Sequence, residues 1–246
     1  NGKSGRALRS TGQWGKRPSV RRCRSEIWAI IIDGTFTIDG SLFVRLGIAS
    51  GSIELKRKRP IVPKLAANLS WLFTEVDFLE RFNGAAQAGF KGVEFLFPYE
   101  FKASDIANRL QDNDLEVVLI NAPPGDWSAG ERGLGCLPGR QADFRGSLSQ
   151  AIDYATAIGC PNIHIMAGIA AAEATDLFIE NLHFAAAACA NAGLRGLIEP
   201  INDIDMPGYF LTRPDQAMEI LDTVASPALG LQLDLYHAAR MGFDPG

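Results

Sequence analysis

LIEPIN at residues 197–202 and LQLDLYH at residues 231–237 are two short apolar runs, and each contains one acidic residue, Glu199 or Asp234. A carboxylate is costly in a dry strand unless something pairs with it. The carboxyl ends of parallel strands are where barrel enzymes place such groups. The two acids are 35 positions apart, about one strand–helix unit. The pattern predicts neighbouring strands of an α/β barrel that present two acids as metal ligands or proton-transfer groups.

Strand-like and helix-like segments alternate from residue 63 onward, which favours a parallel sheet with helical crossovers. No GxGxxG turn follows the first predicted strand, and this argues against a dinucleotide-binding fold. The predicted strands are residues 65–69, 92–97, 116–121, 162–166, 196–199 and 231–234, and the predicted helices are residues 75–88, 104–111, 143–158, 175–192 and 214–223.

Eight such units make a complete (β/α)8 barrel of ~250 residues. Residues 63–246 number 184 and contain about six units, and the chain stops soon after the sixth strand. We therefore expect a (β/α)8 TIM barrel that is truncated at its C-terminus after about six units, as in a fragment of a longer protein.

Residues 1–62 differ in charge from the rest of the chain. They contain 13 Lys and Arg against four Asp and Glu, whereas residues 63–246 contain 11 against 24. We expect a basic extension, disordered or not native to the barrel, with a loose hairpin around Asp39-Gly40 as a weaker alternative. We favour the interpretation that the extension is translated sequence from upstream of the true start. An organelle transit peptide and a nucleic-acid-binding arm are the alternatives.

The overall composition, 47% hydrophobic and 21% charged, is that of a globular protein. No apolar run reaches the ~18 residues that span a bilayer. The four cysteines have no CxxC spacing, which indicates reduced thiols in an intracellular protein. We expect a cytoplasmic protein, or an organellar one if the extension is a transit peptide, with neither a membrane nor nucleic acid as a partner.

Glu199 is the strongest candidate for chemistry. Pro200 has no amide hydrogen, so the strand ladder should end near it and leave the acid at the rim. Asp234 shares a predicted strand face with Gln232 and Tyr236 and should point into the barrel mouth. His237 follows that strand, where loops carry function. A salt-bridge role for Glu199 and a structural role for Asp234 remain the alternatives.

Three residues inside the predicted strands are ambiguous. Glu94 and Asn121 are either pocket walls or structural hydrogen-bonding groups. His164 stands alone in an apolar run, and we interpret it as a satisfied core residue.

A loop rich in glycine and proline, residues 122–140, is too long for a simple connector. Trp127 could cover a bound ligand. Arg132 and Arg140 could bind a substrate carboxylate through the planar guanidinium fork. An ordered surface loop is the alternative.

Five segments together resemble the hydroxypyruvate isomerase family, which belongs to the xylose-isomerase-like TIM barrels along with ketose epimerases and an endonuclease branch. The resemblance covers residues 63–246, and residues 1–62 lie outside it. The segments are ANLSWLF (67–73), GVEFLFPY (92–99), GDWSAGERG (125–133), IEPIN (198–202) and DLYH (234–237).

The resemblance implies an isomerase that interconverts hydroxypyruvate and 2-hydroxy-3-oxopropanoate through an enediolate, with Glu199 as acid/base. It implies a divalent metal held by Glu199 and Asp234. Oxygen-rich ligands with no cysteine nearby favour Mg²⁺ or Mn²⁺ over Zn²⁺, and we expect no organic cofactor. The substrate is a small 2-oxo or hydroxy acid, and a homo-oligomer remains open. Our candidate substrate-binding residues are His237, Asp205, Asn121 and Arg132, the last because the carboxylate of such a substrate needs a cationic partner.

Four alternatives stay open within this resemblance. They are a 2-oxo-tetronate isomerase, a free-sugar isomerase or epimerase, an inactive fragment, and a metal-dependent endonuclease. The family's remaining metal ligand and second glutamate would follow Gly246. An endonuclease with three metals would need more histidines than the three present, and the acidic barrel segment would repel DNA.

Overall fold

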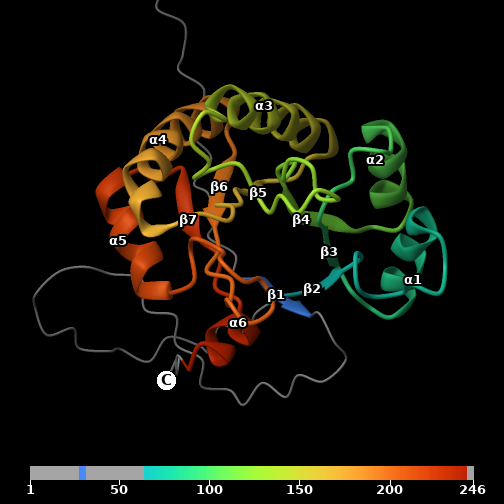
Figure 1. Cartoon of the computed structure of the whole chain (residues 1–246). Helices are drawn as coiled ribbons and strands as arrows, with labels where there is room; N and C mark the ends of the chain where they lie inside the picture. The colour runs from blue at the N-terminus through green and yellow to red at the C-terminus, as the bar shows by residue number, and fades with distance from the viewer. Residues whose placement is uncertain (1–27, 32–63, 243–246) are drawn as a thin grey trace, which may run out of the picture.

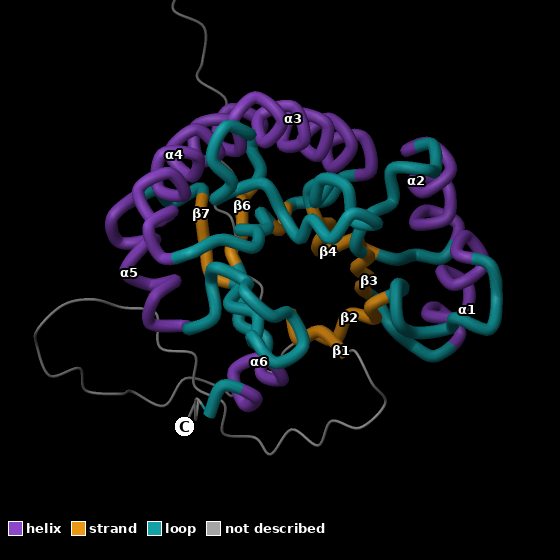
Figure 2. The backbone as a smooth tube through the Cα atoms, in the orientation of Figure 1, coloured by secondary structure: helices purple, strands orange, loops and turns teal. Residues whose placement is uncertain are grey.

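The structure is a computed structural model, and it describes residues 28–31 and 64–242. Seven strands form one sheet in the order β1 to β7, and every neighbouring pair is parallel. Figures 1 and 2 show these strands in an arc with helices α1 to α5 outside it. Curvature of this kind, with a helix between successive strands from β2 to β7, is that of a TIM barrel.

The strands are β1 (Trp28–Ile31), β2 (Lys64–Asn68), β3 (Gly92–Phe95), β4 (Glu116–Asn121), β5 (Asn162–His164), β6 (Arg195–Ile198) and β7 (Leu229–Leu231). The helices are α1 (Arg81–Gln87), α2 (Ala103–Asp112), α3 (Gln141–Ile158), α4 (Thr175–Ala192), α5 (Pro214–Val224) and α6 (Leu235–Arg240), with 3-10 turns η1 (Phe78–Glu80) and η2 (Ala172–Ala174). Among the described residues, no helix has the length and apolar character needed to cross a bilayer.

Alternation along each strand separates two faces. Val93 and Phe95 on β3 pack against Phe82 of α1 and Ile106 of α2 in the layer between sheet and helices. Glu94 stands between them and therefore faces the opposite way, into the barrel. The main apolar core thus lies outside the strands and leaves the inner face free for polar groups.

Two helices end as the sequence predicts. Gly159 after α3 and Gly193 after α4 adopt left-handed conformations, with φ of 73° and 71°. A glycine accepts this conformation without the strain that a Cβ would add. These ends turn the chain directly into β5 and β6.

The predicted strand at residues 231–234 is wrong in its extent. Strand β7 ends at Leu231, and Leu233 is exposed. Asp234 instead caps the N-terminus of α6, because its Oδ1 accepts hydrogen bonds from the amides of Tyr236 (2.7 Å) and His237 (3.3 Å). The apolar alternation after Leu231 belongs to the start of a helix.

A further strand lies in the segment that we assigned to the basic extension. Strand β1 pairs in parallel with β2, so that Trp28 is opposite Lys64 and Ile31 is opposite Ala67. The hairpin predicted around Asp39-Gly40 lies outside the described residues.

Candidate active site

Polar side chains occupy the inner face of the barrel at the carboxyl ends of six successive strands. Each alternates with residues that pack in the outer apolar layer. Five of the seven buried polar residues in the described part of the chain belong to this set. We call the set the polar ring, and its members are Asn68, Glu94, Asn121, His164, Glu199 and Gln232.

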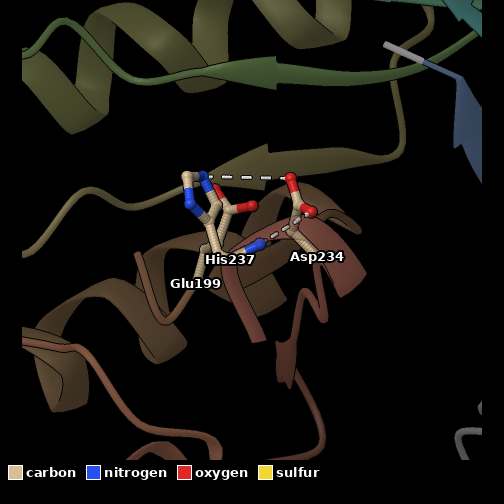
Figure 3. A group of neighbouring side chains, drawn as sticks. All are labelled: Glu199, Asp234 and His237. Atoms are coloured by element: carbon tan, nitrogen blue, oxygen red, sulfur yellow. Dashed lines mark hydrogen bonds and ion pairs between the residues drawn. The ribbon is translucent and has the colours of Figure 1, made fainter. Parts of the chain in front are cut away.

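Glu199, Asp234 and His237 form a close cluster at this end of the barrel. One ligand atom from each lies within 4.8 Å of the others. Glu199 directly follows β6, whereas Asp234 and His237 come from the start of α6 (Figure 3). The two acids and the histidine that the sequence singled out are therefore brought together.

Burial is the largest influence on Glu199, which is 6% exposed, and it raises the pKa of the carboxyl well above its usual value. The negative charges of Asp234 and Glu94 raise it further, while a hydrogen bond from the Gln232 side chain opposes the shift. A carboxylate with a raised pKa is a stronger base, and one that is protonated can return the proton.

His164 lies beside Glu199, with 3.5 Å between its Nδ1 and Glu199 Oε2. Burial depresses the pKa of His164 to about 3, so the ring is neutral at physiological pH. The contact is therefore between a neutral imidazole and the acid, and it holds the base without supplying a charge. Our interpretation of His164 as a satisfied core residue was wrong: it is buried, but its Nε2 has no hydrogen-bond partner.

Asp205 connects the loop after β6 to α6. Its Oδ2 accepts from the Tyr236 hydroxyl (2.7 Å) and from Asn202 Nδ2 (3.0 Å), and its Oδ1 accepts from Arg240 (3.0 Å). These three donors lower its pKa, Tyr236 most strongly. The observed contacts of Asp205 position its neighbours; a direct contact with substrate remains a prediction.

Arg132 is held inside its own loop. Its guanidinium carbon lies 3.9 Å above the Trp127 ring, and Nη1 donates to the carbonyls of Trp127 (3.0 Å) and Glu131 (2.8 Å). Trp127 in turn packs on Phe97, just after β3. The role of Arg132 as a substrate-carboxylate ligand stays a prediction.

Two other predicted residues have defined partners. Arg140 is engaged by Glu131 and Asp143. Asn121 is 8% exposed, its carbonyl accepts from the Tyr99 hydroxyl at 2.5 Å, and its Nδ2 has only a long contact with Met166 Sδ, 3.9 Å. The Asn121 amide therefore retains hydrogen-bonding capacity on the inner face, whereas the Arg140 guanidinium is occupied by Glu131 and Asp143 together.

The sequence profile described as "Xylose isomerase-like TIM barrel" matches residues 82–245. The chain belongs to this family. It is 51% identical over 181 residues to the 2-oxo-tetronate isomerase of Cupriavidus necator. The aligned region covers 72% of this chain and 70% of that protein. It is 44% identical to the hydroxypyruvate isomerase of Escherichia coli, with 72% and 71% covered.

Solved structures agree on the fold. A crystal structure of an AP endonuclease, family 2, from Brucella melitensis is 48% identical, with a TM-score of 0.73 and 74% of this chain and 72% of that chain covered. A D-psicose 3-epimerase from Clostridium cellulolyticum is 12% identical, with a TM-score of 0.60, and the match covers 72% of this chain and 65% of that chain. At this identity the match supports the fold alone. The resemblance to the isomerase members of this TIM-barrel family is confirmed.

The ligand atoms that this site offers fit a hard divalent cation. Glu199 and Asp234 offer oxygen atoms, which Mg²⁺ and Mn²⁺ prefer. The negative charge of Asp234 is one of the causes that raise the pKa of Glu199. A cation between them would relieve this repulsion.

Sequence reasoning gave too little weight to Asn68, Glu94, His164 and Gln232. Each sits in or beside a short apolar run, where a polar residue looks structural when it is considered alone. The signal that could have found them is a repeated pattern: each is a polar residue with apolar neighbours on both sides in a different predicted strand. Only the observed strand ends place these residues at or near the carboxyl end of the sheet.

Proposed function

We propose that this chain isomerises a small 2-oxo acid, interconverting hydroxypyruvate and 2-hydroxy-3-oxopropanoate, with Glu199 moving the proton. The observation that carries the proposal is a buried carboxyl with a raised pKa, held against a neutral His164 and facing Asp234 and His237. Removal of a proton from a carbon beside a carbonyl needs a base of this kind. The isomerase relatives support the same reaction class.

Each residue near Glu199 has a distinct part in this scheme. His164 and Gln232 hold the Glu199 carboxyl in place, and His237 reaches the same space from α6 to bind a substrate oxygen. Asp234 and Glu199 would hold a divalent metal. When bound, such an ion stabilises negative charge on the enediolate oxygens.

A 2-oxo-tetronate is the second candidate substrate. The relative from Cupriavidus necator, named for that substrate, is 51% identical to this chain, whereas the hydroxypyruvate isomerase of Escherichia coli is 44% identical. Both substrates have a carboxylate beside the oxo group, so the same base could act on either. Comparing kcat/KM for the two substrates decides between them.

The free-sugar isomerase or epimerase and the endonuclease predict different behaviour. A sugar enzyme needs no partner for a carboxylate and should be indifferent to Arg132→Ala. Endonuclease chemistry on this barrel requires nicking of DNA that contains an abasic site. The relatives at 40–51% identity that bear isomerase names favour the oxo-acid reading.

The test is turnover in deuterated water with Glu199→Gln beside Glu180→Gln, a matched change on the exposed surface of α4. Loss of the base should lower kcat about 10²- to 10⁴-fold, whereas the control keeps wild-type activity. Deuterium should enter the product at the carbon that receives the proton. Near-full turnover by Glu199→Gln, with its fold intact, would remove Glu199 as the base.

A further inference from the structure

Three buried polar atoms of the polar ring have no hydrogen-bond partner: Glu94 Oε2, His164 Nε2 and Gln232 Oε1. In the described residues only one other such side-chain atom exists, Asn181 Oδ1, which belongs to α4. An unsatisfied buried polar group is costly, and native proteins seldom keep one without a reason. Their concentration on one face of the barrel points to a ligand that supplies the missing partners.

The hydrogen bonds around Glu94 determine what its free oxygen can offer. The Ser70 amide donates to Asn68 Oδ1 at 2.9 Å, so the other end of the Asn68 amide, Nδ2, faces Glu94 and donates to its Oε1 at 2.6 Å. Oε1 is therefore an acceptor, and a proton on this carboxyl resides on Oε2, the atom without a partner.

The surroundings of Glu94 favour its protonated form. The residue is 5% exposed, and burial is the largest of the influences that raise its pKa to about 8. Asp234 raises this pKa too, while the bond from Asn68 opposes the shift. The other ionisable groups facing it, Glu199 and the Cys160 thiol, contribute no positive charge.

We propose that Glu94 is a substrate-binding residue that donates a hydrogen bond from Oε2–H to an oxygen of the bound oxo acid while keeping its proton. This proposal rests on the proposed function and deepens it. A neutral donor suits the position, because an ionised Glu94 would repel an anionic substrate, and a lysine there would neutralise Glu199. His164 Nε2 and Gln232 Oε1 extend the same polar lining.

Two substitutions separate donation from charge. Glu94→Gln keeps an oxygen for Asn68 and places an N–H donor at the Oε2 position, whereas Glu94→Met has similar length and offers neither. Glu100→Gln, on the exposed loop after β3, is the matched control. We expect Glu94→Gln to bind tartronate, an unreactive hydroxy dicarboxylate, within about threefold of the wild type, and Glu94→Met to bind it about tenfold more weakly.

Two results would overturn the inference. One is a folded Glu94→Gln protein that binds as weakly as Glu94→Met, since Glu94 would then act as an anion. The other is a Glu94→Met protein with wild-type affinity. Circular dichroism and thermal unfolding establish that each variant is folded before binding is compared.

Infrared difference spectra test protonation independently of turnover. The wild type at pH 7 should show the carbonyl stretch of a protonated carboxylic acid that is missing in Glu94→Gln, and tartronate should shift it to lower frequency. Absence of such a band would overturn the inference. If the band is present and shifts but neither oxo acid is turned over, the proposed reaction fails while the role of Glu94 as a donor stands.

Discussion

His237 Nδ1 lies 2.6 Å from Nδ2 of Asn202, and this contact selects the tautomer of the histidine ring. The amide of Asp205 donates to Asn202 Oδ1 at 2.9 Å, and the Asn202 Nδ2 also donates to the Asp205 carboxylate. The Asn202 amide therefore has one satisfactory orientation, with its NH₂ toward His237. His237 Nδ1 must accept, so the proton of the neutral ring is on Nε2, which lies 3.9 Å from Asp234 Oδ2.

This arrangement makes His237 a hydrogen-bond donor at the site. Burial lowers the pKa of His237, against the opposing influence of Asp234 and Asp205. A neutral ring with its proton on Nε2 can donate to a substrate oxygen, whereas a metal ligand needs that nitrogen bare. The geometry therefore favours oxygen atoms of Glu199 and Asp234, and not His237, as metal ligands.

Changing Asn202 to Asp should move the proton of the His237 ring from Nε2 to Nδ1. A carboxylate at this position can only accept from the ring, so Nδ1 gains the proton and Nε2 loses it. We expect kcat/KM to fall about tenfold or more, and the ¹⁵N shifts of His237 to exchange between the two ring nitrogens. Asn83→Asp, on the exposed face of α1, adds the same charge away from the site and should change neither. Unchanged ring shifts in Asn202→Asp would refute the assignment.

Divalent cations should stabilise the protein through Glu199 and Asp234. Millimolar Mg²⁺ or Mn²⁺ should raise Tm, because a ligand that binds only the folded state shifts the unfolding equilibrium. In Asp234→Asn the rise should shrink or vanish, while α6 persists because asparagine is also a good N-cap. Asp222→Asn on α5 serves as the control. A full Tm rise in Asp234→Asn would contradict this site.

Stability should fall as pH rises through the range set by Glu94. Its pKa is about 8 in the folded state against an ordinary value of 4.5, so the folded state keeps a proton that the unfolded state releases between these values. The free energy of unfolding then decreases with pH, by up to about 1.4 kcal/mol per pH unit for one proton.

Urea unfolding at pH 5 and pH 8, in chelator, measures this effect. Glu94→Gln has no proton to retain, so its stability should fall less than that of the wild type over the same interval. In both proteins burial and the charge of Asp234 keep the pKa of Glu199 raised, and Glu94→Gln removes only the influence of the Glu94 charge on it. An identical change in the free energy of unfolding between pH 5 and pH 8 for the two proteins would show that Glu94 is already ionised.

Gly133 anchors the loop that carries Arg132 and Trp127. Its φ is +124°, it pairs with Ala167 after β5, and an added Cβ would lie 2.5 Å from the Met166 carbonyl oxygen. Gly133→Ala should destabilise the protein by about 1–3 kcal/mol, since it combines backbone strain with a backbone clash.

Gly130→Ala in the same loop separates these two effects. Gly130 has a φ of +94° but no atom within 4 Å of an added Cβ. Gly130→Ala would therefore introduce backbone strain without a clash. Chemical denaturation should show the smaller loss for Gly130→Ala. Equal losses would mean that the contact with Met166 contributes nothing.

Much of this architecture was readable in the sequence. The alternation of apolar runs and amphipathic segments predicted β2 to β6 and α3 to α5 with small errors at their ends, and the acid that closes β6 marked Glu199 as a site residue. Asp234 was also found, but for the wrong local reason, because Leu233 and Leu235 continue the alternation of a strand that has already ended. Hydrophobic periodicity alone cannot distinguish a strand end from a helix start over so few residues.

The amino-acid sequence by itself determined the parallel α/β class and two acids on adjacent units, because hydrophobic periodicity and strand-end position are local properties of the chain. Only the tertiary structure decided that Glu94 and His164 face Glu199, since they lie on β3, on β5 and just after β6, and these positions meet only when the sheet curves. It also decided where protons reside on Glu94 and His237, because that depends on which end of Asn68 and of Asn202 is already hydrogen-bonded. Such constraints are set by partners in space, which the local pattern does not specify.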